Sequence, residues 1–83
     1  MKRANSSLER DLRFRLEFAY RVVKRRDALS LSQEDVAKRV GCTRTSVVNT
    51  EAGRQLPRLQ DLSQWAAALK CRMAYLLGEV SKP

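Results

Sequence analysis

Five side chains within one short stretch could recognise the edges of nucleic-acid bases. Arg44 can donate two hydrogen bonds to guanine, and Asn49 can form a bidentate pair with adenine. Thr45 and Ser46 can bond either bases or phosphates, and Val48 can touch a thymine methyl group. Side chains suited to phosphate contacts lie on both sides of this stretch, namely Gln33, Thr43, Arg54 and Arg58. These residue types predict double-stranded DNA as the ligand; the alternative is an ordinary solvated helix face with an incidental exposed valine.

Other kinds of chemistry find little support. Histidine is absent, which removes the commonest general base and the commonest metal ligand. Cys42 and Cys71 lie far apart and neither belongs to a CxxC pair, so we expect reduced thiols packed as small apolar groups. The sequence has no glycine-rich phosphate loop and no cluster of carboxylates. We therefore predict no enzymatic activity, no metal and no cofactor.

Charge and length narrow the class of protein further. The chain has 83 residues and a net charge of +8, from 17 Lys and Arg against 9 Asp and Glu. A basic domain attracts polyanions, either nucleic acid or anionic lipid. The length fits one small domain and excludes a multidomain or barrel enzyme. No apolar run is long enough to span a bilayer and no signal-peptide stretch follows Met1, so we expect a cytoplasmic protein with no membrane partner.

Glycine and proline divide the chain into helical segments, and no segment shows sustained strand alternation. We predict an all-α fold. The expected helices cover about residues 7–28, 33–40, 44–52, 59–69 and 72–77. The first begins at Ser6 or Ser7, because Ser6 and Glu9 have capping-box spacing. The domain is expected to span residues 7–78, between a disordered tail over 1–6 and a C-terminal tail over 79–83.

Two neighbouring helices have the helix-turn-helix plan. Ser32 and Asp35 have the spacing of a capping box for the helix over 33–40, and Thr43 can cap the helix over 44–52. A three-residue turn that contains glycine joins them. In this plan the first helix crosses the phosphate backbone and the second lies in the major groove, which accepts one α-helix.

Apolar spacing predicts the core. Two stripes follow the first helix, one containing Phe14, Phe18 and Val22, the other containing Leu8, Leu12 and Leu16. One stripe can face the core, whereas the other needs a partner, which is either the last helix with the tail or another chain. The fourth helix is expected to bury Leu59, Leu62, Trp65, Ala66 and Leu69, with Trp65 as a core anchor.

A longer pattern runs through the two central helices and the loop that follows. It consists of S-Q-E-D-V-A at 32–37, Gly41, T-R-T-S-V at 43–47, E-A-G-R at 51–54 and Pro57. This pattern resembles the phage-repressor and Cro type of helix-turn-helix domain, a family also called Xre-type or lambda-repressor-like, over about residues 18–77. The resemblance implies a compact five-helix domain that binds operator DNA as a homodimer, here with an extended first helix.

The resemblance also implies roles for single residues. The family's base readers fall on Arg44, Thr45 and Asn49. Its phosphate contacts fall on Gln33, Thr43 and the basic loop with Arg54. An arginine of the first helix and a glutamate of the third, which form an ion pair in relatives, fall on Arg26 and Glu51.

Three positions depart from the family's pattern, one of which is Trp65, in place of a smaller aliphatic residue. Thr50 replaces the usual Ile or Leu, so its hydroxyl needs an acceptor such as the carbonyl of Ser46. Arg58 replaces a small residue before the fourth helix, which predicts a weak N-cap.

The function predicted from these features is that of a sequence-specific transcriptional regulator, a repressor that acts as a homodimer on an inverted repeat. The stripe of Leu8, Leu12 and Leu16 lies outside the resemblance and is a candidate dimer or partner surface. The alternative is an antitoxin or protein-interaction module. In that case the first helix binds a protein partner, such as a toxin or another regulator, and DNA binding is secondary.

Overall fold

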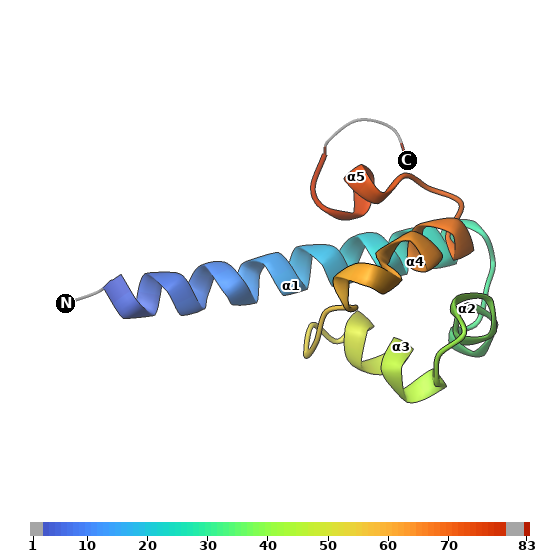
Figure 1. Ribbon diagram of the computed structural model, residues 1–83, viewed down its shortest axis with the longest axis horizontal. Helices are drawn as coiled ribbons and strands as arrows, with labels where there is room; N and C mark the ends of the chain where they lie inside the picture. The colour runs from blue at the N-terminus through green and yellow to red at the C-terminus, as the bar shows by residue number, and fades with distance from the viewer. Residues whose placement is uncertain (1–2, 80–82) are drawn as a thin grey trace.

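The computed structural model describes residues 3–79 and Pro83, with side chains from residue 7 onward. Five α-helices follow one another: α1 (Arg3–Ala28), α2 (Gln33–Val40), α3 (Arg44–Glu51), α4 (Leu62–Ala68) and α5 (Met73–Leu76). A 3-10 turn, η1 (Leu59–Asp61), precedes α4, and no strand occurs among the described residues. Figure 1 shows the short helices gathered around the C-terminal half of α1. The predicted all-α five-helix fold is confirmed.

The first helix is longer than the sequence predicts. It begins at Arg3 instead of at Ser6 or Ser7, so residues 3–6 are helical where we expected a disordered tail. No glycine or proline precedes Ser6, and the helix therefore continues through this segment. Its N-terminal half projects beyond the other helices (Figure 1), which gives the molecule a longest dimension of 44 Å. Residues 1–2 and most of the predicted C-terminal tail, 80–82, lie outside the described residues.

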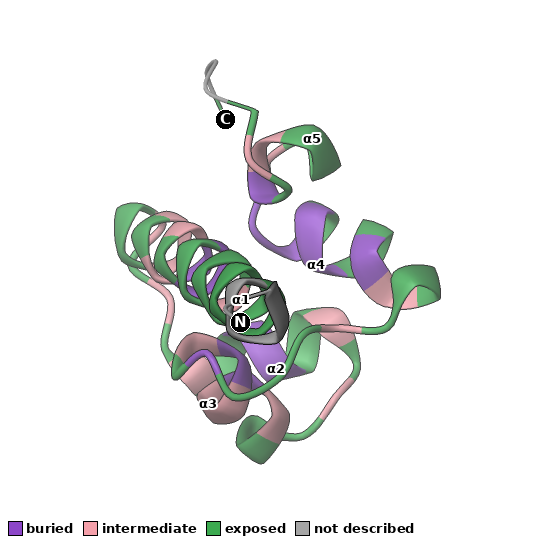
Figure 2. Cartoon of the chain, turned by 90° about the vertical axis from the view of Figure 1, so that its left-hand side faces the viewer, coloured by how far each residue is buried: buried purple, intermediate pink, exposed green. Residues whose placement is uncertain are grey.

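The core lies between the C-terminal half of α1 and the four short helices. Buried residues face one another across α1 to α4 (Figure 2). The cluster contains Phe18, Val22, Val36, Ala37, Val47, Leu62, Trp65, Ala66, Leu69 and Leu76. Trp65 is 3% exposed, which confirms the predicted core anchor.

Two residues predicted for apolar faces of the core are exposed. Leu59 was expected to begin the fourth helix on its buried side, but its side chain is 84% exposed. The chain forms the η1 turn at this point, and the regular helix begins only at Leu62, so the inward spacing does not extend back to Leu59. Phe14 is also exposed, because it lies on the part of α1 that extends past the body.

Local caps set the directions of α2 and α3. Ser32 Oγ accepts a hydrogen bond from the Asp35 backbone N–H at 3.0 Å, and the Asp35 carboxylate accepts one from the Ser32 backbone N–H at 2.9 Å. This is the predicted capping box. Gly41 ends α2 with φ of 87°, a left-handed conformation that glycine adopts without steric cost. Thr43 then caps α3 by accepting a hydrogen bond from the Ser46 backbone N–H.

The capping box should make the stability of the protein sensitive to acid. Hydrogen bonds from the Ser32 backbone and side chain lower the pKa of Asp35 below its ordinary value. The stabilisation is therefore present above the unfolded pKa of about 4 and is lost as pH falls through the lower folded pKa. We expect Asp35→Asn to remove part of this acid sensitivity in urea unfolding between about pH 2 and pH 5. Glu34→Gln, at an exposed neighbouring position, is the control. An equal change in both variants would contradict the role of the box.

Candidate nucleic-acid interface

The helix-turn-helix unit is formed by α2, the turn at Gly41–Thr43, and α3. Val36 of α2 and Val47 of α3 belong to the same buried cluster, which fixes the two helices against each other and against α1. The caps at both ends of the turn satisfy backbone groups that the short helices leave free. The result is a rigid support for one outward face of α3.

The outward face of α3 carries most of the predicted base-reading residues. Arg44 and Thr45 are exposed, Val48 and Asn49 are partly exposed, and Val47 is buried on the opposite side. At 100° of rotation per residue, the directions of the four exposed or partly exposed side chains span about 140° around the helix axis. The structure therefore brings Arg44, Thr45, Val48 and Asn49 together, as expected for a face that enters a groove.

Ser46 lies apart from this face. Its hydroxyl accepts a hydrogen bond from Thr43 Oγ1 at 3.2 Å, and its backbone N–H donates to the same oxygen at 3.1 Å. Thr43 is thus the N-cap of α3 and remains exposed at the edge of the unit. Both residues are placed beside the helix start rather than among the base-reading side chains.

Two arginines border the α3 face. Arg54 Nη1 donates to Asn49 Oδ1 at 3.2 Å, so the loop after α3 orients the side chain of Asn49. Arg58 donates to Asp61 Oδ2 at 2.8 Å and makes no cap bond, as expected for a weak N-cap. Both arginines are exposed and can turn toward a phosphate.

A close contact fixes the loop that presents Arg54. Gly53 has φ of +76°, and a Cβ atom built there would lie 2.6 Å from the Leu16 side chain. Arg15 Nε also donates to the Gly53 carbonyl at 3.0 Å. The positive φ therefore favours glycine here, whereas the contact with α1 involves only the movable end of the Leu16 side chain.

The ion pair implied by the resemblance is present and is largely buried. Arg26 Nε lies 2.6 Å from Glu51 Oε2, and Arg26 Nη2 donates to Glu51 Oε1 at 3.1 Å. The side chains are 18% and 7% exposed. The hydrogen bond to Glu51 raises the pKa of Arg26 above its ordinary value, so the guanidinium stays charged. Arg26 Nη1 also donates to the carbonyl of Leu31, which ties α1 to the start of α2.

Gln33 connects this ion pair to the α3 face, a role that the sequence did not suggest. Its Nε2 donates to Glu51 Oε1 at 3.0 Å, while its Oε1 lies 3.5 Å from Arg44 Nη2. Gln33 was predicted only as a phosphate contact at the start of α2. Its side chain also contacts Arg44 directly, and it is held in place by Glu51, which Arg26 binds in turn. Residue spacing gave no signal of this link, because it joins three separate helices.

The expected hydrogen bond from Thr50 is not formed. Its side chain is 1% exposed, and its Oγ1 has no hydrogen-bond partner in the structure, the Ser46 carbonyl included. A buried unpaired hydroxyl costs about 1–3 kcal/mol. Thr50 packs among core residues at a position where an aliphatic side chain would fit without that cost.

Metal binding and membrane insertion find no support in the described part of the chain. No group of three or more His, Cys, Asp or Glu residues there could hold a metal ion. Cys42 and Cys71 are free thiols, and burial raises the pKa of each. None of the described helices has the length and apolarity needed to cross a bilayer.

Comparisons with known proteins agree with this geometry. A family described as helix-turn-helix matches residues 22–76, which is 55 of the 83 residues. The restriction-modification controller protein C.AhdI from Aeromonas hydrophila is 31% identical with a TM-score of 0.71, over 75% of this chain and 94% of the controller. A hypothetical transcription factor, NHTF, from Neisseria is 33% identical with a TM-score of 0.72, over 77% of this chain and 74% of that protein.

A third solved structure supports the fold alone. It is an HTH_3 family transcriptional regulator from Vibrio cholerae, 21% identical with a TM-score of 0.73, over 80% of this chain and 37% of that protein. None of the curated proteins matches this chain. The matched residues contain the complete helix-turn-helix unit, the Arg26–Glu51 pair and all of the buried cluster except Phe18. The chain therefore belongs to the Xre/Cro-type helix-turn-helix family, whose members are DNA-binding transcriptional regulators and not enzymes.

Proposed function

We propose that this protein is a cytoplasmic repressor that binds an inverted repeat in double-stranded DNA as a homodimer. The observation that carries the proposal is the outward face of α3, where Arg44, Thr45 and Asn49 lie on a rigidly capped helix and are open to solvent in whole or in part. In the major groove Arg44 reads guanine, Asn49 reads adenine and Val48 contacts a thymine methyl. Half-sites one helical turn apart, about 34 Å, present the same face of the duplex to both copies.

Phosphate contacts position the helix on the duplex. Backbone N–H groups and the amide of Gln33 at the start of α2, Thr43 at the start of α3, and the loop arginines Arg54 and Arg58 lie around the α3 face. Each neutralised phosphate releases counterions, so binding weakens steeply with salt. Occupation of a promoter by the dimer then excludes other proteins from the same DNA.

Two arginine variants separate base reading from phosphate binding. We expect Arg44→Ala to relax the preference at one base pair of the site by about 1–3 kcal/mol, because a bidentate contact is lost. Arg58→Ala, which leaves the Arg54–Asn49 contact in place, should weaken binding to all sequences similarly and reduce the salt slope by about one phosphate. Selection of sites from random DNA, followed by anisotropy titrations at several salt concentrations, measures both effects.

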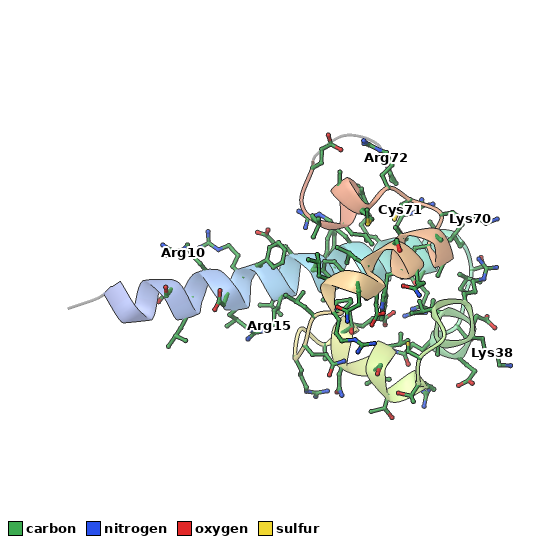
Figure 3. All side chains as sticks on the ribbon, in the orientation of Figure 1. Arg10, Arg15, Lys38, Lys70, Cys71 and Arg72 are labelled. Atoms are coloured by element: carbon green, nitrogen blue, oxygen red, sulfur yellow. The ribbon has the colours of Figure 1, made fainter. Side chains whose placement is uncertain are left out.

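Arg10→Ala provides the matched control for lost charge. Arg10 is exposed on α1 and points away from Arg15, the residue that bonds to the loop after α3 (Figure 3). It should leave both the sequence preference and the salt slope close to wild type. If Arg44→Ala changed neither affinity nor base preference, the assignment of α3 to the groove would be wrong.

A second candidate function rests on the exposed leucines of α1. Leu8, Leu12 and Leu16 form an apolar face that a protein partner such as a toxin could cover, as in an antitoxin or interaction module. Purification of the chain from its native cells distinguishes the two. A tightly bound, stoichiometric second protein would favour this function, whereas the chain alone would favour the repressor.

A further inference from the structure

The described part of the chain leaves one apolar face of α1 largely exposed. Leu8, Leu12 and Leu16 are 67%, 46% and 49% exposed, although they repeat every four residues along one side of the helix. They lie on, or at the edge of, the half of α1 that projects beyond the body (Figure 1). Of the two partners expected for this stripe, the last helix, α5, therefore does not bury it.

An isolated helix of this kind should not be stable by itself. Residues 3–14 of α1 precede Arg15, which bonds to the Gly53 carbonyl, and a helix of that length is marginal in water without tertiary contacts. Exposed leucines add an unfavourable apolar surface to this segment. A partner that covers the stripe would offset both costs.

Charged residues flank the stripe in a regular order. On one side Glu9 precedes Arg13 by four residues, and on the other side Asp11 precedes Arg15 by four. At 100° per residue the two pairs lie on opposite sides of the direction of Leu12. Each flank therefore offers one acid toward the N-terminus and one base toward the C-terminus. Arg10, by contrast, points away from Arg15 (Figure 3).

This order of charge selects one orientation of a second α1. In an antiparallel pair each flank meets the same flank of the partner, which runs in the opposite direction. Glu9 therefore faces the partner's Arg13, and Asp11 faces the partner's Arg15. In a parallel pair opposite flanks meet, so Glu9 would face the partner's Asp11. Like charges at such positions are destabilising.

We propose that a second copy of this chain covers the stripe, with the two α1 helices packed antiparallel and crossing at Leu12. This inference rests on the proposed homodimer and names its surface. Leu12 lies on the two-fold axis against the partner's Leu12, and Leu8 packs on the partner's Leu16. Side chains four residues apart form a ridge along a helix. When such ridges of two helices interdigitate, the helix axes cross at about −50°.

The surroundings of the stripe accommodate such a crossing. The row of residues four apart turns gradually around α1: Leu16 borders the loop at Gly53, and the row then continues to Tyr20. It leads into a groove of about 820 Å³ between α1 and α5, lined in part by Leu16, Tyr20 and Tyr75. The first turns of the partner's α1 can lie there. This extends the contact beyond the three leucines.

The arrangement also suits binding to one duplex. The C-terminal end of α3 lies beside α1 between Arg15 and Arg26, about eight residues or 12 Å from Leu12. The two-fold axis is perpendicular to both crossing helices. Rotation about it places α3 of each copy on the same side of the helix pair. Measured along α1, the two α3 ends are then about 25 Å apart. The lateral separation of the two α1 helices increases this distance toward the ~34 Å of one DNA turn.

Leu12→Glu tests the crossing point. The two introduced carboxylates would meet on the axis, so we expect the dissociation constant of the dimer to rise about 100-fold or more in sedimentation equilibrium without DNA. Leu77→Glu, at an exposed leucine just after α5 (46%), is the matched control and should dimerise like the wild type. Circular dichroism confirms that both remain folded. A wild-type monomer, or a Leu12→Glu dimer of unchanged strength, would overturn the proposal.

Charge reversal tests the orientation. Glu9→Arg and Arg13→Glu should each weaken self-association about 10-fold, because ion pairs become repulsions. An equimolar mixture of the two variants should regain dimers, since the base introduced at position 9 of one meets the acid introduced at position 13 of the other. Stronger dimers of Glu9→Arg alone would indicate parallel helices and reject the model. Neither measurement involves DNA, so a failure of the proposed DNA binding would be seen separately, in the Arg44→Ala titrations.

Discussion

Replacement of Glu51 by alanine is expected to destabilise the protein by about 3–5 kcal/mol, the usual cost of removing one partner of a buried ion pair. Arg26 would keep its charge in a site where it is 18% exposed and would lose both hydrogen bonds to the carboxylate. Gln33 Nε2 would lose its acceptor as well. A domain of 83 residues has a total stability of about 4–12 kcal/mol, so a large fraction of the variant should be unfolded at physiological temperature.

Thermal and urea unfolding, followed by circular dichroism, measure this loss. Each kcal/mol lowers the melting temperature of a domain this small by about 4–8 °C. Glu17→Ala is the control, because Glu17 is 53% exposed and lies 3.9 Å from Arg21, an arrangement worth at most about 1 kcal/mol. Specific DNA binding should disappear with the fold and return at low temperature, where Glu51→Ala is native. A variant that melts like the wild type would refute the structural role of the pair.

The parts of the fold that depend on local signals could be predicted from the sequence. The capping box of Ser32 and Asp35 and the cap at Thr43 all occur where the sequence places them. These features need only a few neighbouring residues, so their chemistry is visible in the chain itself. The five-helix order follows from the same signals, and the family resemblance supplied the Arg26–Glu51 pair, which no local pattern reveals.

The failures have a different physical origin. Leu59 fits the apolar spacing of α4, but the chain forms a 3-10 turn there and the residue faces water. Thr50 has a carbonyl within sequence reach, yet tertiary packing leaves its hydroxyl unpaired. Gln33 bridges Glu51 and Arg44 because three helices meet at one point. The last two outcomes depend on contacts between distant segments, which spacing along the chain does not encode.

The same meeting of helices explains how the candidate interface is held in place. Arg44 is not supported by α3 alone, because it lies against Gln33, which is bonded to Glu51, which is bonded to Arg26 on α1. Asn49 is held by Arg54, and the loop of Arg54 is held by Arg15 through Gly53. Both ends of the outward α3 face are therefore tied to α1, whose free half carries the proposed dimer contact. Orientation of the α3 face and pairing of the two copies depend on one helix.

Trp65→Ala is expected to have a comparably large effect on stability, about 3–5 kcal/mol, for a different reason. The indole is 3% exposed and packs in the cluster that joins α1, α2 and α4, so its removal leaves a cavity that the neighbours fill only in part. A tryptophan that stacked on a nucleic-acid base would need an exposed ring, which this one lacks. The variant should therefore lose DNA binding only in proportion to its unfolded fraction.

Leu59→Ala gives a sharp control for Trp65→Ala, since Leu59 precedes the same helix but is 84% exposed. It should change the free energy of unfolding by no more than about 0.5 kcal/mol. Urea unfolding followed by far-ultraviolet circular dichroism compares the two without relying on tryptophan fluorescence. Trp65→Phe should recover much of the stability, because a ring refills most of the space. If Leu59→Ala were as destabilising as Trp65→Ala, α4 would have to begin earlier and bury a different face than the one described.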